Sequence, residues 1–171
     1  MASTCVLPAA RNFKKYVHQI VPLMQAFQSL EMNSIEEILD QQEIEYSILP
    51  AKEGYKIYRG WLELFARPVK EQTGKYTVNG FVWEAYMSGL LPSLDGNAGM
   101  QYYQSREREE FFIIHENGKS VFDCDRIGWP GFLSLEVIVF PKSKEWSMVF
   151  SHEQTMHYVE PITSHPLATK R

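Results

Sequence analysis

The dipeptide Asn117-Gly118 constrains the fold of this chain more than any other feature of its sequence. It lies between two apolar segments, FFIIHE and KSVFDCD, and both of its residues accept the positive φ angles of a two-residue hairpin turn. Counting outward from the turn places apolar residues opposite one another: Ile114 with Val121, Ile113 with Phe122, and Phe111 with Cys124. The sequence therefore predicts an antiparallel pair of strands here.

A second Asn-Gly pair, Asn79-Gly80, allows two interpretations. As a hairpin turn it would place Tyr76 opposite Trp83 and Lys75 opposite Glu84, an aromatic pair and a pair of opposite charges. The segment that follows, FVWEAYMSGLL, also suits a helix. We take the hairpin as the prediction and keep the helix as the alternative.

Two further strands are predicted in the last third of the chain. Residues 132–140 are rich in β-branched and other apolar residues, which indicates a central strand. Residues 146–152 alternate between large apolar and smaller side chains, which predicts a strand with one side exposed to solvent. Because short turns join these segments, their strands should pair antiparallel.

Helices are predicted in the first half. Apolar residues recur at helical spacing over residues 13–27, and Ser34 with Glu37 has the spacing of a capping box at the start of a second helix. Residues 52–68 are ambiguous, because glycines interrupt a helical pattern. We expect a single α+β domain over residues 1–171, with N-terminal helices packed on a mainly antiparallel sheet and flexible termini at 1–9 and 162–171.

Composition excludes several classes of protein. No apolar run approaches the roughly 20 residues that cross a bilayer, and the first residues lack a signal-peptide pattern. Two cysteines, Cys5 and Cys124, make no disulfide framework, so we expect a reducing compartment and a cytoplasmic protein. Seventeen basic against 21 acidic residues, with only short basic clusters, argue against nucleic-acid binding. Glycine-rich phosphate-binding motifs are missing from the sequence, so no cofactor is expected.

Acidic residues of the hairpin suggest one catalytic alternative. Asp123 and Asp125 share a strand face and, with His152 or His115, could hold a divalent ion in a small metal-dependent hydrolase. His152 and His157 are five residues apart, which does not fit a zinc-protease helix. The hairpin register separates His115 from Cys124 by about 13 Å, too far for a nucleophilic pair within the hairpin.

The most unusual feature is a block of one charge sign. Between Lys15 and Lys52 the chain has no lysine or arginine but six acidic residues. The start of the helix after Ser34 favours the acidic residues of its first turn, Glu36 and Glu37. It does not favour the acidic residues that follow them. We therefore expect an acidic surface that steers a basic protein partner. The residues assigned to this steering are Glu36, Glu37, Asp40 and Glu43.

Trp129 lies in the loop Gly128-Trp129-Pro130-Gly131, which cannot be a helix or a central strand. Its ring either covers the core or contacts a partner. We assign it as a partner-binding anchor, because large aromatic side chains often supply much of the binding energy of an interface.

The segment EWSMVFSHE, residues 145–153, resembles small bacterial toxin-immunity-type α/β proteins, in which a late strand ends in Trp–aromatic–His-Glu. The resemblance covers the last third of the chain. It implies a non-enzymatic binder that neutralises a cognate toxin. The leading hypothesis is thus a protein-binding module, an immunity- or antitoxin-like inhibitor, with the metal-dependent hydrolase as the alternative and the oligomeric state left open.

Overall fold

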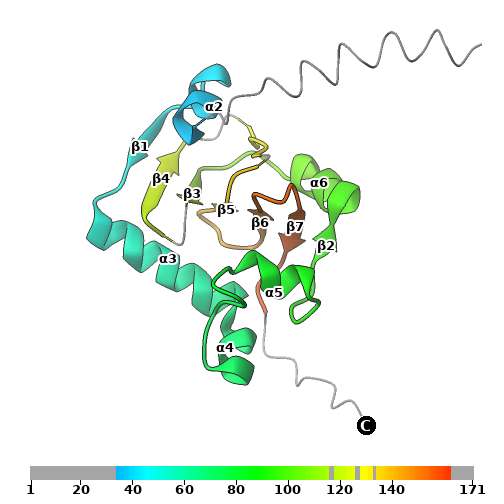
Figure 1. The fold of residues 1–171 in the computed structure, drawn as a ribbon. Coiled ribbons are helices and arrows are strands. Elements are labelled where there is room, and N and C mark those ends of the chain that lie inside the picture. Colours follow the sequence, from blue (N-terminus) through cyan, green and yellow to red (C-terminus); the bar gives the residue numbers. More distant parts are fainter. Residues whose placement is uncertain (1–33, 116–117, 126–127, 133, 163–171) are drawn as a thin grey trace, which may run out of the picture. The chain divides into compact units, whose positions relative to one another are not determined.

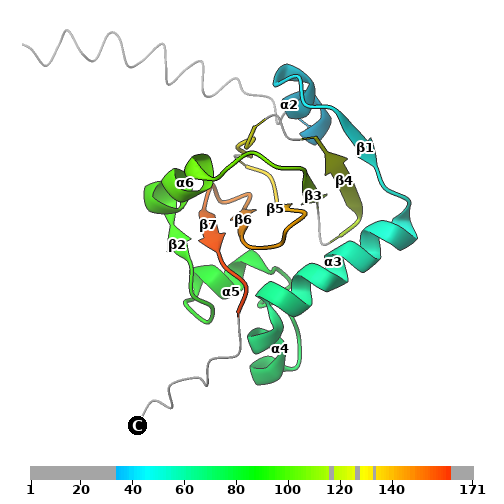
Figure 2. The same cartoon turned by 180° about the vertical axis from the view of Figure 1, so that it is seen from behind.

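The described part of the chain forms one antiparallel sheet with helices on both faces (Figures 1 and 2). The structure is a computed structural model that describes residues 34–115, 118–125, 128–132 and 134–162. Its seven strands follow the order β1-β4-β3-β5-β6-β7-β2. The α+β class is therefore confirmed, whereas the helix expected over residues 13–27 lies outside the described residues.

Helices and strands follow one another along the chain without a regular alternation. The strands are β1 (Tyr46–Ile48), β2 (Leu94–Asp95), β3 (Phe111–His115), β4 (Ser120–Cys124), β5 (Val137–Pro141), β6 (Ser147–Phe150) and β7 (Met156–Val159). The helices are α2 (Ile35–Gln41), α3 (Ala51–Phe65), α4 (Arg67–Thr73), α5 (Trp83–Met87) and α6 (Gly96–Ser105). No helix among the described residues is long and apolar enough to span a bilayer.

The hairpin of β3 and β4 has the predicted register. Its three predicted apolar pairs face one another, and Gly118 adopts a φ of 86°. A Cβ atom at Gly118 would overlap the ring of Tyr58 on α3, so glycine meets two demands at once: positive φ and close approach of a helix.

The predicted capping box begins α2. Glu37 donates its backbone N–H to the Ser34 hydroxyl, and the Ser34 N–H donates to the Glu37 carboxylate. The ambiguous segment after residue 51 is helix α3, because its apolar residues form one buried stripe despite two glycines.

Helices cover both faces of the sheet, not one. On the first face α3, α4 and α5 pack against alternate residues of the strands, among them Ile114, Ile138 and Val149. On the second face α2 and α6 pack against the intervening residues, such as Ile113 and Val139. Helices packed on a mainly antiparallel sheet are therefore confirmed, although the helix expected over residues 13–27 is not among the described residues. The solvent-exposed side predicted for the strand at residues 146–152 is wrong, because all four residues of β6 are buried.

Two other strand predictions need correction. Asn79-Gly80 supports only one bridge, Val78 with Phe81, and the chain then turns into α5, so the helical alternative is right for this segment. The central strand predicted over residues 132–140 begins only at Val137, although its place in the middle of the sheet is confirmed.

The last described residues are tied to the fold. Ile162, where the flexible C-terminal segment was expected to begin, donates its backbone N–H to the carbonyl of Leu64. The sheet ends in two short strands, β1 and β2, and Figures 1 and 2 place them at opposite ends. Six strand spacings separate them, roughly 29 Å along the sheet.

Candidate functional site

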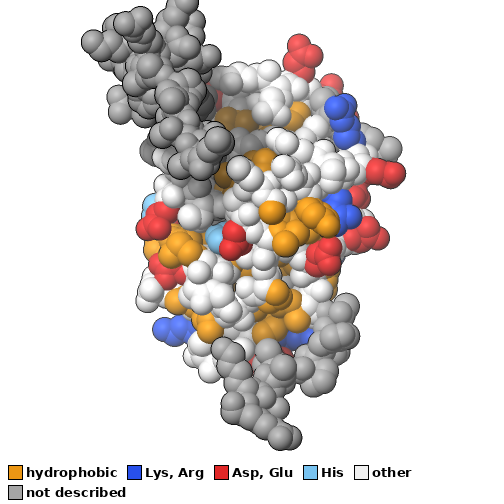
Figure 3. Space-filling model, turned by 90° about the vertical axis from the view of Figure 1, so that its right-hand side faces the viewer, with side chains coloured by type: hydrophobic (Ala, Val, Ile, Leu, Met, Phe, Trp, Pro, Cys, Tyr) orange, Lys and Arg blue, Asp and Glu red, His pale blue; other side chains and the backbone are white. Residues whose placement is uncertain are grey.

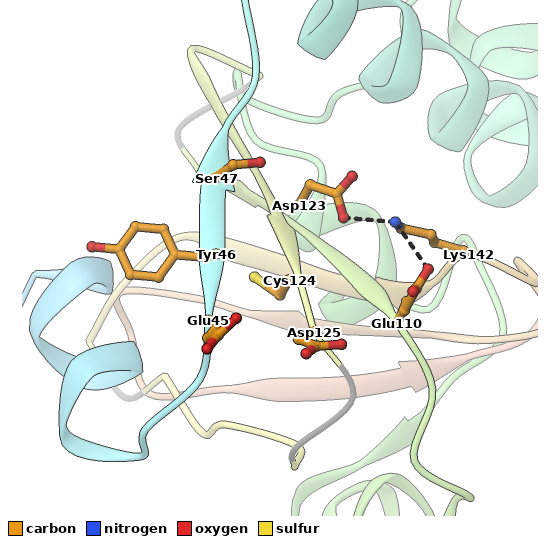
Figure 4. A pocket seen from close by; sticks show the side chains of 8 residues that line it. All are labelled: Glu45, Tyr46, Ser47, Glu110, Asp123, Cys124, Asp125 and Lys142. Atoms are coloured by element: carbon orange, nitrogen blue, oxygen red, sulfur yellow. Dashed lines mark ion pairs between the residues drawn. The ribbon is translucent and has the colours of Figure 1, made fainter.

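A pocket of about 260 Å³ opens beside β1 and is lined by four carboxylates and one ammonium group. We call it the carboxylate pocket and define it by Glu45, Glu110, Asp123, Asp125 and Lys142. Figure 4 shows Asp123 and Glu110 converging on Lys142, with Glu45 and Asp125 near the end of β4. Carboxylates thus outnumber cations in the pocket.

Sheet pairing brings these residues together from four segments. The register of β1 on β4 places Ser47 opposite Asp123, and the backbone N–H of Asp125 donates to the carbonyl of Glu45 at 2.9 Å. On the other side of β4, the backbone N–H of Lys142 donates to the carbonyl of Glu110 at 2.9 Å. The pocket therefore forms where the ends of β4, β3 and β5 meet β1.

Lys142 is held by two carboxylates. Its Nζ lies 2.8 Å from Asp123 Oδ1 and 3.1 Å from Glu110 Oε2. The hydrogen bond to Asp123 is the largest cause that raises the pKa of Lys142, and the bond to Glu110 adds to it. The lysine thus stays charged and offsets part of the negative charge of the pocket.

The predicted steering residues lie on α2 and the turn after it. Asp40 and Glu43 are exposed, Glu37 is exposed and engaged in the capping box, and Glu36 is half-buried. Partial desolvation, and then the charges of Asp40 and Glu36, raise the pKa of Tyr46. These two carboxylates therefore lie near the ring of Tyr46, which Figure 4 shows pointing away from the ion pairs of Lys142.

Trp129 is packed against the core. Its ring lies 4.6 Å from that of Trp146 and 5.3 Å from that of Phe111, centroid to centroid, and its indole N–H donates to the carbonyl of Arg106 at 3.0 Å. The ring of Trp129 therefore covers the core, which was the first of the two interpretations of this loop. A contact of Trp129 with a partner stays a prediction.

The ligand set of the hydrolase alternative is not assembled. Asp123 lies on β4 and is paired with Lys142, whereas His152 follows β6, three strands away, and hydrogen-bonds Glu136 at 2.6 Å. His115 occupies the opposite end of the hairpin from Asp123. In the described ranges no three His, Cys, Asp or Glu side chains are arranged to hold a metal ion.

Cys124 offers little nucleophilic chemistry although it borders the pocket. Burial, and then the neighbouring charge of Asp123, raise the pKa of Cys124 to about 12. Since the thiolate is the reactive form, the thiol is inert at neutral pH.

Sequence reasoning missed three residues of the pocket in different ways. Glu45 belonged to the acidic block but received no role. Glu110 could have been found, because continuing the hairpin register by one pair places it opposite Asp125. Lys142 could not, because its position depends on the pairing of β5 with β3, which joins segments that no short turn connects.

Comparison with known proteins gives no family for this chain. No family model, no curated protein and no solved structure matches it.

Proposed function

We propose that the protein is a non-enzymatic binding module that captures a basic protein partner at the β1 edge of its sheet, in the manner of an immunity or antitoxin-like inhibitor. The observation that carries this proposal is the carboxylate pocket, whose lining holds four carboxylates and a single lysine that pairs with two of them. The resemblance of residues 145–153 to toxin-immunity-type proteins supports the choice of partner class.

Charge favours rapid capture at this edge. Asp40 on α2 and Glu43 in the turn after it add exposed negative charge to the segment that leads into β1, and the chain carries a net charge of −4. Fields of this kind reach about 8 Å in physiological salt and speed the association of oppositely charged proteins. A cationic side chain of the partner would meet Glu45 beside the two ion pairs of Lys142.

The pocket also supports binding better than catalysis. Its one thiol is buried and protonated, and its one lysine is held by two carboxylates. An ammonium held in this way is a poor base or nucleophile, because deprotonation would break both ion pairs.

The test is capture from the native host with two matched variants. The site variant combines Asp40→Asn, Glu43→Gln and Glu45→Gln; the control variant combines Glu53→Gln, Glu107→Gln and Glu153→Gln. Each removes three exposed carboxylates, so both have the same net charge. We expect wild type and control to retain the same basic protein in stoichiometric amount and the site variant to lose it, as measured by quantitative mass spectrometry.

Retention of the protein by the site variant would reject the β1 edge as the capture surface. A retained partner that is itself acidic would reject the charge argument as a whole, because like charges would then face one another.

A further inference from the structure

The outer edge of β1 is open to a further strand. β1 is the terminal strand of the sheet, and Figures 1 and 2 show no described helix or strand beyond it. The terminal strand at the other end, β2, is more enclosed, because its Leu94 carbonyl packs against Gly99 of α6. Strand addition is therefore considered at β1.

Charge also separates the two terminal strands. Desolvation raises the pKa of Asp95 on β2, but hydrogen bonds with Ser93 and His157 outweigh it and hold that pKa below its ordinary value. The contact with His157 Nδ1 measures 2.7 Å. Figure 3 shows apolar patches among side chains of both charge signs on the side that carries β2 and α6. The β2 end thus favours no charge in a partner.

The backbone of β1 directs two of its residues away from the sheet. Successive residues of an antiparallel strand form backbone hydrogen bonds alternately to one side and to the other. The Glu45 carbonyl and the Leu49 N–H each form a 2.9 Å hydrogen bond on the β4 side. The N–H and C=O groups of Tyr46 and Ile48 therefore point outward, and no other residue in the described ranges bonds them. An added strand could form hydrogen bonds with all four groups.

Glu45 ends a row of charged side chains that crosses one face of the sheet. Tyr46 packs in the core beneath α2, so Glu45, which alternates with it, lies on the opposite face. The strand register aligns Glu45 with Asp125, then with Glu110, and finally with Lys142. This row holds three carboxylates, with its ammonium group at the end far from β1.

A cation on an added strand would complete this row. Lys142 pairs with Glu110 and Asp123, whereas the exposed Glu45 side chain forms no ion pair with any residue that the structure describes. Side chains directly opposite on neighbouring strands have Cβ atoms about 5 Å apart. A lysine or arginine opposite Glu45 would therefore be within reach, and an acidic side chain there would be repelled.

The other face of the added strand would meet an apolar side chain. Ile48 lies two residues after Tyr46 and thus on the same face of β1, and it is 56% exposed. An exposed apolar residue on a terminal strand favours pairing with another chain. Apolar side chains at alternate positions of the added strand would cover Ile48.

We propose that the basic partner adds an extended strand to the outer edge of β1, with lysine or arginine side chains on the face of Glu45 and apolar side chains on the face of Ile48. Main-chain hydrogen bonds supply affinity in such complexes, and alternate side chains supply specificity. This proposal rests on the proposed capture at the β1 edge and adds how the partner docks. A second copy of the chain is a poorer occupant, because each copy carries a net charge of −4.

Two synthetic peptides test the edge without knowledge of the partner. The probe is a nine-residue peptide that alternates lysine and valine; its matched control alternates glutamate and valine. Residue-resolved amide hydrogen exchange by NMR on the full chain should show fast exchange at Tyr46 and Ile48 without peptide. Saturation with the lysine peptide should slow both amides tenfold or more. The glutamate peptide should leave them unchanged, and the Ser47 amide, which faces β4, should be slow throughout.

Variants of the edge separate backbone from side-chain effects. Ile48→Pro removes an outward N–H but no bond to β4, a change that terminal strands tolerate. It should weaken binding of the lysine peptide tenfold or more by fluorescence anisotropy, whereas Ile48→Val, which keeps the N–H, should weaken it less than threefold. Glu45→Lys should weaken it tenfold or more with a smaller salt dependence. Its matched control is Glu153→Lys, which alters an exposed carboxylate after β6.

Thermal unfolding shows whether each variant is folded; if Ile48→Pro is not, Glu45→Lys and the exchange data decide. Three results would overturn the proposal: slow exchange at Tyr46 and Ile48 without peptide, equal binding of the two peptides, and peptide binding that a folded Ile48→Pro variant retains. Protection of both amides that rises with protein concentration alone would assign the edge to a second copy instead.

Partner capture distinguishes this proposal from the proposed function. Loss of the captured protein by both Ile48→Pro and the site variant would support strand addition. Capture that the folded Ile48→Pro variant retains and the site variant loses would reject strand addition and leave the proposed function in place. Peptide binding at Tyr46 and Ile48, together with capture that the site variant retains, would support the open edge and reject the proposed function.

Discussion

The two ends of the sheet differ in the chemistry they present. At the β1 end, four carboxylates line a pocket with Lys142, which pairs with Asp123 and Glu110. At the β2 end, Leu94, Tyr102 and Tyr158 line a groove whose walls are mostly apolar. Edge strands expose unpaired backbone groups and need protection from unwanted pairing. Here the short β1 is flanked by charge and the shorter β2 is packed against α6, so each end is guarded and each still offers a distinct surface.

Each end also depends on one glycine that lets a helix approach the sheet. At the β1 end, Gly54 of α3 packs on Val121 of β4. At the β2 end, Gly99 of α6 packs on the carbonyl of Leu94 and the backbone nitrogen of Tyr158. The first neighbour is a side chain and the second is backbone, which predicts unequal tolerance to substitution.

Gly99→Ala should have the largest effect on stability. The new Cβ would overlap the Leu94 carbonyl oxygen, so α6 must move away from β2 and β7. We expect a loss of about 3 kcal/mol in the free energy of unfolding, measured by urea denaturation. Gly54→Ala should cost about 1 kcal/mol or less, because its Cβ meets Val121 Cγ2 at 3.0 Å and alanine favours the helix. Equal losses would contradict the contrast between the two ends.

Trp129→Ala should destabilise the fold by about 2 kcal/mol, since the half-buried ring packs on Phe111 and Trp146. Trp129→Phe should recover part of this loss but not the hydrogen bond to the Arg106 carbonyl. Denaturant titration measures both. A stable Trp129→Ala variant that fails to retain the partner would instead restore the anchor assignment of this residue.

The two ends should respond to opposite limits of pH. The pKa of Asp95 is lowered in the folded state, so its contribution is present above about pH 4 and is lost as the pH falls through the folded value. The pKa of Lys142 is raised, so its contribution is present below about pH 10.5 and is lost as the pH rises through the folded value.

Both pH effects should be less than about 1 kcal/mol, because the groups are partly exposed. Comparison of thermal unfolding of wild type with Asp95→Asn and Lys142→Met over a range of pH measures them. The difference from wild type should shrink at acid pH for the first variant and at alkaline pH for the second. If the difference shrank at alkaline pH for Asp95→Asn and at acid pH for Lys142→Met, the ion pairs described for Asp95 and Lys142 would be contradicted.

Local signals explain what the sequence predicts well. The Asn117-Gly118 dipeptide predicts the register of β3 and β4, and Ser34 with Glu37 predicts the start of α2, because each signal depends on residues only a few positions apart. Neither edge strand was predicted, since two or three residues are too few for a periodic pattern.

The sequence-based prediction failed for a polar side chain whose hydrogen-bond partners are distant in the sequence. Ser147 was expected on a solvent-exposed side of its strand, but it accepts a hydrogen bond from the indole of Trp61 and donates one to the carbonyl of Val139. A buried serine with both bonds made looks, in sequence, like an exposed one. The groove lined by Leu94, Tyr102 and Tyr158 was missed for a related reason: its walls come from segments more than 50 residues apart.

The salt dependence of association tests the central claim most directly. Stopped-flow fluorescence would give the association rate constant of the captured partner with wild type and with the site variant of Asp40, Glu43 and Glu45 between 50 and 300 mM salt. Over this range the Debye length falls from about 14 Å to about 6 Å. We predict a steep fall with salt for wild type and a slower, flatter response for the variant. Equal rates and equal slopes for the two proteins would contradict capture at the carboxylate-rich end of the sheet.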